Sequence, residues 1–276
     1  MGRKDMRRAP KWKNAAELRR ATETAWGERP RQGGGTDNAC GAAAGAVRRS
    51  KIPAMRTYVI RRLAGGSRPG HWTDPIWSAA DTVAVDQFHP RSTDHRPITR
   101  ASVLYDTDHL YVRFEVEDRY VRCVHAGYQQ MVCLDSCVEF FVRPGAAGGY
   151  FNFEVNCGGS LLLYYIEDWR RVPGGFAGYT TVDAALGEHV KILHSLPPRV
   201  DPEIVDPVRW FIMLTIPLSV LRAYAAFAGP SHGDVWSGNF YKCGDRTSHP
   251  HWASWSPIGE RLDFHQPERF GQLLFD

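Results

Sequence analysis

From residue 56 onward the sequence is a series of short apolar and aromatic runs, each bounded by turn residues. Residues 110–116 alternate apolar and polar side chains, as a strand with one buried face does. Further runs of this kind cover 101–104, 138–142, 151–155, 161–166, 210–216, 238–242 and 273–275. Many short strands with few helical patterns predict an all-β fold, an antiparallel β-sandwich of the jelly-roll or immunoglobulin-like kind. One short helix is expected within 217–225.

Charge divides the chain into two predicted parts. Residues 1–54 carry 13 Lys and Arg against 5 Asp and Glu and almost no large aliphatic side chains, which predicts a basic, disordered tail. Residues 55–276 carry 21 Lys and Arg against 25 Asp and Glu, so the expected sandwich domain is mildly acidic and is not expected to have a basic face for nucleic acid.

The start of the chain has no recognisable signal peptide. The longest apolar run, at 161–166, is far shorter than the roughly 18 residues of a membrane span. We therefore expect neither a nucleic-acid nor a membrane partner, and the compartment is left open.

Metal binding has weak support in the sequence. The six cysteines contain no CxxC pair, so buried free thiols are the simplest interpretation, although Cys133 and Cys137 are four residues apart. The acidic segments 106–108 and 115–118 are either solvated turns or calcium ligands, without the fixed spacing of a calcium loop. We expect that no cofactor is required. The alternative is a structural calcium ion.

The most informative segment is a predicted hairpin. Residues 135–142 and 150–156 flank a turn rich in Gly and Pro, so the two runs should pair. Amphipathicity sets the register, because a slip by one residue would exchange the two faces. Val138 opposite Val155 then places Glu139 opposite Glu154 on the second face, beside the amides of 152 and 156.

Two facing carboxylates leave three interpretations open. The face is solvated, or it binds a glycan through planar carboxylate and amide groups, or it is the active site of a glycoside hydrolase. Like charges directly opposite each other are destabilising, which favours a compensating partner. A retaining glycosidase needs carboxyl groups about 5–5.5 Å apart, and neighbouring strands allow that spacing.

Five stretches in order resemble carbohydrate-binding module family 9, most closely its stand-alone bacterial proteins. They are DSCVEFF at 135–141, YFNFEVNC at 150–157, NFYKCGD at 239–245, SWSP at 254–257 and DFHQPERFG at 263–271. The resemblance implies a β-sandwich that binds sugar between two aromatic rings and performs no chemistry, and that works beside carbohydrate-degrading enzymes in polysaccharide catabolism. It also implies structural calcium ions.

Carried onto this sequence, the resemblance identifies most of the ligand-binding candidates. Glu154 replaces a basic residue of sugar-binding members, and Cys133 stands where a second stacking Trp is expected. Trp252 and Trp255 are either packing residues or a ligand platform, and we include Trp255. The predicted contact residues are Glu139, Glu154, Asn156, Lys242, Phe264 and Trp255. The main hypothesis is non-catalytic carbohydrate binding; the alternatives are a hydrolase using Glu139 and Glu154, or a sandwich with a decayed sugar site.

Overall fold

The computed structural model describes residues 55–145 and 148–276. The predicted tail 1–54 lies outside the described residues. Residues 55–145, 148–169 and 178–276 belong to one compact unit, and residues 170–177, where β9 turns into β10, belong to a second. Among the described residues, no helix combines the length and apolar character that a membrane crossing needs.

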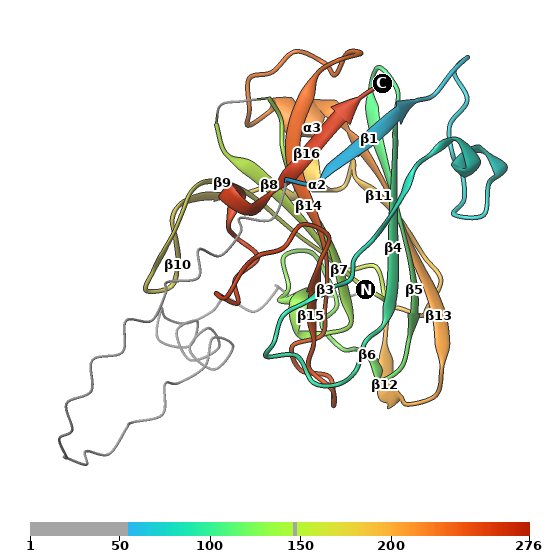
Figure 1. Ribbon diagram of the computed structural model, residues 1–276, viewed down its shortest axis with the longest axis vertical. Coiled ribbons are helices and arrows are strands. Elements are labelled where there is room, and N and C mark those ends of the chain that lie inside the picture. Colours follow the sequence, from blue (N-terminus) through green and yellow to red (C-terminus); the bar gives the residue numbers. More distant parts are fainter. Residues whose placement is uncertain (1–54, 146–147) are drawn as a thin grey trace, which may run out of the picture. The chain divides into compact units, whose positions relative to one another are not determined.

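The larger unit contains two layers of strands, as the β-rich pattern predicts (Figure 1). We call the first layer sheet A. Its strands in spatial order are β10 (Gly175–Thr181), β9 (Leu161–Val172), β8 (Tyr150–Asn156), β7 (Cys137–Arg143), β14 (Val235–Cys243) and β16 (Gly271–Phe275). β15 (Trp252–Ser254) pairs with β14, and β3 (Gln87–Phe88) pairs with β15.

The second layer, sheet B, is built around a long antiparallel pair, β5 and β13. Its strands in order are β4 (Ile98–Tyr105), β5 (His109–Asp118), β13 (Val208–Pro217) and β11 (Lys191–His194), with β2 (Thr82–Ala84) beside β4. β6 (Val121–Cys123) and β12 (Val200–Ile204) form a separate pair.

The predicted all-β sandwich is confirmed, and β1 (Thr57–Arg62) departs from its antiparallel pairing. This strand runs parallel to β16 and then parallel to β4, and so joins both sheets. The partners of a parallel strand come from distant parts of the chain, so no local turn signal predicts their pairing.

The helices are few and short. The expected helix is α3 (Leu218–Arg222), and α2 (Ala184–Gly187) is a second one that the sequence analysis did not identify. The described part of the chain also forms three 3-10 turns: η1 (Pro75–Ala79), η2 (Val132–Leu134) and η3 (Pro267–Arg269).

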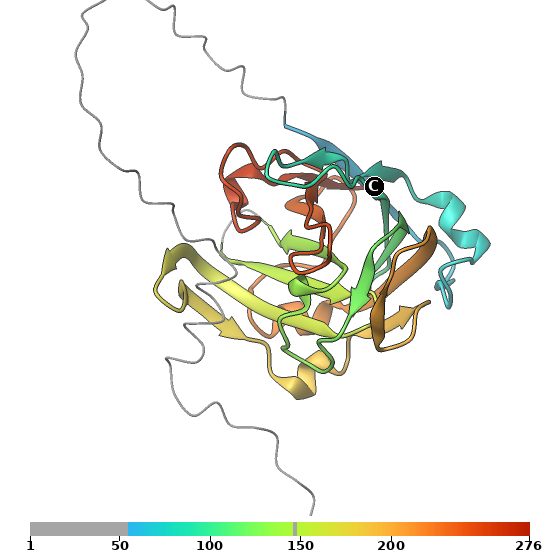
Figure 2. The ribbon, with the colours of Figure 1, turned by 90° about the horizontal axis from the view of Figure 1, so that it is seen from below.

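The hydrophobic core lies between the sheets and is rich in aromatic side chains. Phe140 and Phe240 stack with their ring centroids 5.2 Å apart, and Phe114 from sheet B meets Phe240 edge to face at 6.1 Å. Sheet A is also covered on its outer face, since all seven residues of β8 are buried. In Figure 2 the C-terminal loops, in red, lie against this sheet.

Candidate functional site

The predicted hairpin register is confirmed. Val138 pairs with Val155 and Phe140 with Phe153 toward the core, while Glu139 pairs with Glu154 on the outer face of sheet A. Both glutamates are deeply buried, with exposures of 2% and 5%. The two carboxylates are thus held opposite each other by rigid strands, but beneath other side chains rather than on an open surface.

The neighbours of the two carboxylates differ. Asn152 donates from Nδ2 to Oε1 of Glu154 over 2.8 Å, and Nε2 of His265 lies 3.8 Å from the same oxygen. Glu139 accepts from the thiol of Cys243 at 3.2 Å. Burial, and after it the charge of Glu154, raise the pKa of Glu139 well above its ordinary value. A protonated Glu139 can donate a hydrogen bond, which an ionised carboxylate cannot do.

Phe264 lies on this outer face, as the resemblance implied. Its ring stacks on Tyr241, the residue opposite Glu139 on β14, with centroids 4.1 Å apart and planes 11° apart. The hydroxyl of Tyr241 donates to the carbonyl of Phe264 at 2.9 Å. Because one side of the ring rests on Tyr241 and only 8% of Phe264 is exposed, this residue forms part of the wall more than a free stacking platform.

Lys242 does not join this group, which corrects the prediction that placed it in the contact patch. Successive side chains of a strand point to opposite faces, and Lys242 pairs with the core residue Val138. Its ammonium group lies on the inner side of sheet A, fully buried. It donates to the carbonyl of Cys243 at 3.0 Å, pairs with Nε2 of His251 at 2.6 Å, and lies 3.3 Å from Oδ2 of Asp118.

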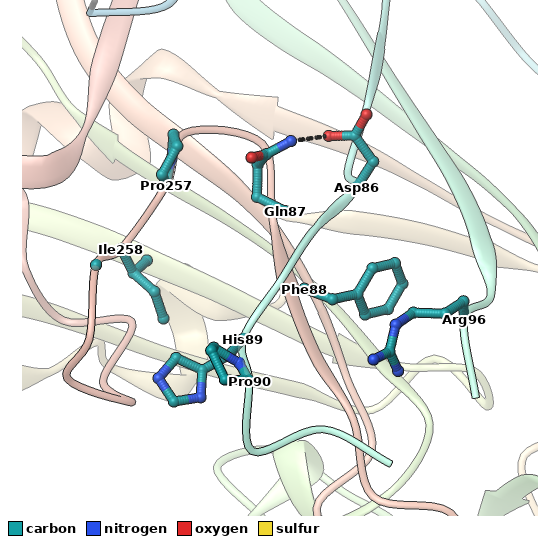
Figure 3. Close-up of a pocket in the computed structure, with 9 residues that line it drawn as sticks. Asp86, Gln87, Phe88, His89, Pro90, Arg96, Pro257 and Ile258 are labelled. Atoms are coloured by element: carbon teal, nitrogen blue, oxygen red, sulfur yellow. Dashed lines mark hydrogen bonds between the residues drawn. The ribbon is translucent and has the colours of Figure 1, made fainter. Parts of the chain in front are cut away.

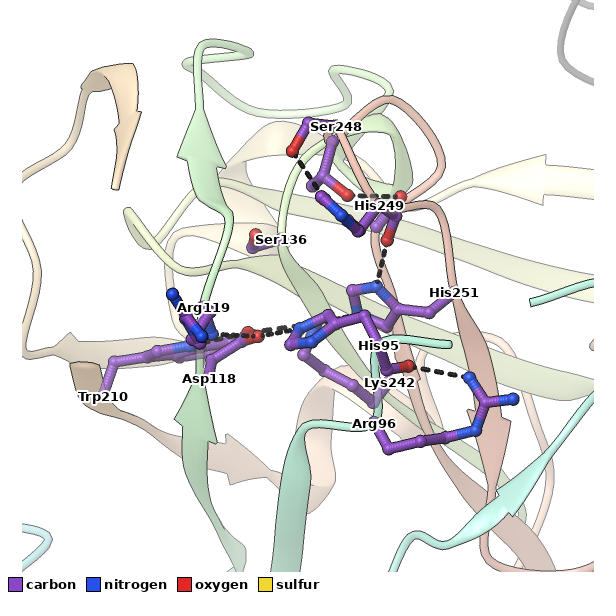
Figure 4. Close-up of polar contacts among 12 residues, drawn as sticks. His95, Arg96, Asp118, Arg119, Ser136, Trp210, Lys242, Ser248, His249 and His251 are labelled. Atoms are coloured by element: carbon purple, nitrogen blue, oxygen red, sulfur yellow. Dashed lines mark hydrogen bonds and ion pairs between the residues drawn. The ribbon is translucent and has the colours of Figure 1, made fainter. Parts of the chain in front are cut away.

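Figure 4 shows this inner cluster, which comes from β5, β14, the segment before β15 and the loop before β4. His95 contacts the second oxygen of Asp118 at 2.8 Å, and the indole of Trp210 donates to Asp118 at 3.2 Å. Burial favours the neutral form of Asp118, but Lys242 and His95 together hold its pKa below the ordinary value. Burial and the charge of Lys242 lower the pKa of His251 to about 3, so this imidazole is neutral and accepts from the ammonium.

Trp255 is also misplaced in the prediction, because it belongs to the core. Its ring centroid lies 5.7 Å from that of Phe240 and 6.4 Å from that of Tyr58. The tryptophan on the outer face is Trp252, which stands opposite Cys243 on β14. Trp252 is half-buried and donates from its indole to Asp245 at 2.7 Å. Two tryptophans three residues apart in a strand must face opposite ways, but the sequence alone does not say which one faces outward.

Asn156 lies on the outer face, but its amide is engaged within the protein. It donates to Oδ2 of Asp135 at 3.0 Å and to the carbonyl of His125 at 2.7 Å, and it accepts from the amide of Ser160 at 2.9 Å. Asn156 therefore closes the turn after β8 and, in this conformation, offers no free group to a ligand.

The acidic segments considered for calcium have basic partners. Arg68 pairs with Asp106 at 3.1 Å and with Asp108 at 3.6 Å, and Arg100 contacts Glu117 at 2.8 Å. Structural calcium stays a prediction.

A depression of about 460 Å³ lies away from the predicted residues (Figure 3). It is lined by 86–90, Arg96 and 257–259, at the edge of sheet A formed by β3. The guanidinium of Arg96 covers the ring of Phe88 at 4.8 Å. None of the six predicted contact residues lines this depression.

The fold and the outer face together define the class: a β-sandwich that carries paired carboxylates and aromatic rings on one sheet. Residues 77–275 match the model of carbohydrate-binding family 9. The chain belongs to carbohydrate-binding family 9.

Solved structures agree with this fold. A candidate carbohydrate-binding protein from Bacteroides uniformis is 28% identical, with a TM-score of 0.70 over 81% of this chain and 100% of that one. A family 9 module from Caldicellulosiruptor kristjanssonii in complex with cellotriose is 14% identical, with a TM-score of 0.52 over 80% of this chain and 94% of that one. The structure of a family 9 module from the same organism in complex with glucose is 14% identical to this chain, with a TM-score of 0.51. The match covers 80% of this chain and 96% of that one. Among curated proteins, no sequence matches the chain.

Proposed function

We propose that the protein binds carbohydrate through the outer face of sheet A and performs no chemistry on it. The family match over 77–275 carries this proposal. The register supports it, because Glu139 and Glu154 lie opposite each other on one face of the family's sandwich. Carboxyl and amide groups on rigid strands can bind the hydroxyls of a sugar.

Two half-buried rings mark the ends of this face. Tyr164 on β9 pairs with Asn152 on β8, and Trp252 on β15 pairs with Cys243 on β14. β9 and β15 are four strand spacings apart, or about 19 Å at about 4.8 Å per spacing. The two rings are too far apart to sandwich one sugar ring, so a ligand that contacts both of them is an oligosaccharide.

Binding without turnover is tested with the full chain and a panel that includes glucose, cellotriose and chromogenic glycosides. We expect heats of binding for at least one oligosaccharide and no hydrolysis over hours. Glu154→Gln should weaken the binding about tenfold or more, since a hydrogen bond to a charged group contributes about 1.5–3 kcal/mol. The control is Glu117→Gln on sheet B, an exposed carboxylate that is paired with Arg100.

The burial of the predicted contacts favours one second candidate, a family 9 sandwich whose sugar site is closed. Glu139, Glu154 and Phe264 are each less than a tenth exposed. If no sugar of the panel binds at millimolar concentration, this candidate replaces the proposal. If a glycoside is hydrolysed and the variants Glu139→Gln and Glu154→Gln are both inactive, the protein is an enzyme instead.

A further inference from the structure

Three metal-ligating side chains meet on the outer face of sheet A. Cys137 and Cys243 are directly opposite each other on β7 and β14, and Glu139 is two residues along β7 from Cys137. One ligand atom of each lies within 4.8 Å of those of the other two. The thiol of Cys243 is 3.2 Å from Oε1 of Glu139.

The three side chains are shielded from water and lack a positive partner. Cys137, Glu139 and Cys243 are 0%, 2% and 1% exposed. Both cysteines are free thiols. Within residues 55–145 and 148–276, no Lys, Arg or His forms an ion pair with Glu139, whose one hydrogen bond comes from Cys243. Buried charged groups are normally paired or bound to a metal.

We propose that Cys137, Glu139 and Cys243 form a binding site for a thiophilic divalent cation, for which Zn²⁺ is the best fit. Zn–S bonds of about 2.3 Å and Zn–O bonds of about 2.0–2.2 Å in a tetrahedron separate ligand atoms by roughly 3.5–3.8 Å. In the structure all three ligand atoms lie within 4.8 Å of one another, and the closest pair, Cys243 Sγ and Glu139 Oε1, is 3.2 Å apart. Ca²⁺ and Mg²⁺ are a poor match because they take oxygen ligands.

The binding step involves protons but no redox change. Zinc ligands are deprotonated, so each Zn²⁺ displaces one proton from each thiol, and a third from Glu139 where that carboxyl is protonated. Three protein ligands leave one tetrahedral position for a fourth ligand. With two thiolates and one carboxylate bound, the zinc site has the same net charge as an ionised Glu139 beside two neutral thiols, so the carboxylate gains a cation as its partner without a change in net charge.

This proposal stands independently of carbohydrate binding, since its test contains no sugar. The full chain is reduced with a phosphine, stripped with a chelator and titrated with Co²⁺, followed by competition with Zn²⁺. We expect thiolate-to-cobalt charge-transfer absorption and tetrahedral d–d bands that Zn²⁺ removes, with release of two to three protons per ion. Absence of these bands in the wild-type protein overturns the proposal, whatever the variants do.

Variants separate this site from the other thiols. Cys243→Ser and Cys137→Ser should weaken Zn²⁺ binding more than about 100-fold, since loss of an outer partner of a ligand alone costs 10- to 100-fold. Cys123→Ser and Cys157→Ser are the matched controls, because these thiols lie in the core. Cys40→Ser removes the thiol outside the described residues.

Two results of the variant series would overturn the assignment. One is equal loss in the control variants. The other is a Cys137–Cys243 disulfide in protein purified without added oxidant, because the pair would then be a redox couple and not a metal site. Circular dichroism of each variant shows that it is folded.

Discussion

Lys242→Met tests whether Lys242 is a structural cation or a ligand contact. The ammonium is fully buried and has three acceptors: the Cys243 carbonyl at 3.0 Å, His251 at 2.6 Å and Asp118 at 3.3 Å. Methionine keeps the length of the side chain but removes the charge. Asp118 then keeps only His95 and Trp210 as side-chain partners in the cluster.

The expected loss of stability is large. Removing one partner of a buried ion pair costs about 3–5 kcal/mol, a sizeable part of the roughly 5–15 kcal/mol by which domains are stable. Urea denaturation followed by tryptophan fluorescence measures it as a lower midpoint at unchanged slope. Lys242→Met combined with Asp118→Asn should lose less than the sum of the single variants, by about 0.5–3 kcal/mol, because the two groups are coupled.

The same variant decides between the two roles. Lys242 faces away from Glu139, so the folded variant should bind oligosaccharide and Co²⁺ as the wild type does. A variant of normal stability that has lost carbohydrate affinity would refute this reasoning and return Lys242 to the contact patch.

Further predictions concern the rings and the pH dependence. Trp252→Ala should weaken oligosaccharide binding about tenfold in calorimetry, an aromatic contact being worth roughly 0.5–1.5 kcal/mol beyond its area. Trp72→Ala, in the loop before η1 where the ring stacks on Phe211 of sheet B, should not weaken it. Trp255→Ala should cost about 3–5 kcal/mol in urea denaturation because it empties part of the core, and unchanged stability would contradict its core position. The pKa of His251 in the folded protein, about 3, lies below its value of 6.5 in the unfolded chain. The contribution of the neutral imidazole to folding stability is therefore complete above pH 6.5 and is lost as the pH falls toward 3. The stability difference between His251→Gln and wild type should therefore change across that window, and a constant difference would show that His251 does not titrate there.

The hairpin could be predicted from sequence because its information is local. The turn between the two strands and the alternation Val138, Glu139, Phe140 allow only one register that buries the apolar face. The same local signals identified α3 and the strands β4, β5 and β13 of sheet B, but not its short strands β2 and β11. The parallel pairings of β1 have no local signal, since their partners are more than 40 residues away.

The faces of β14 could not be predicted, because apolar side chains occupy both. Phe240 faces the core and Tyr241 faces outward, under Phe264. Both positions are apolar because the C-terminal loops cover the outer face of sheet A, so hydrophobicity does not distinguish inside from outside. Lys242 then looks like a surface residue, although it lies on the inner side.

Lys242 and Cys243 are neighbours in sequence, but their side chains lie on opposite sides of sheet A and contact different acidic groups. Lys242 lies on the inner side of sheet A, where Asp118 already balances its charge. Glu139 lies on the outer side with the Cys243 thiol, and no basic side chain of the described chain pairs with it. The partner of this carboxyl group can therefore be a proton, a sugar hydroxyl or a metal ion. Glu139→Gln should thus change both Co²⁺ and oligosaccharide binding, while Lys242→Met, one residue from the ligand Cys243, changes neither. Equal effects of the two substitutions would show that the faces of sheet A are not independent.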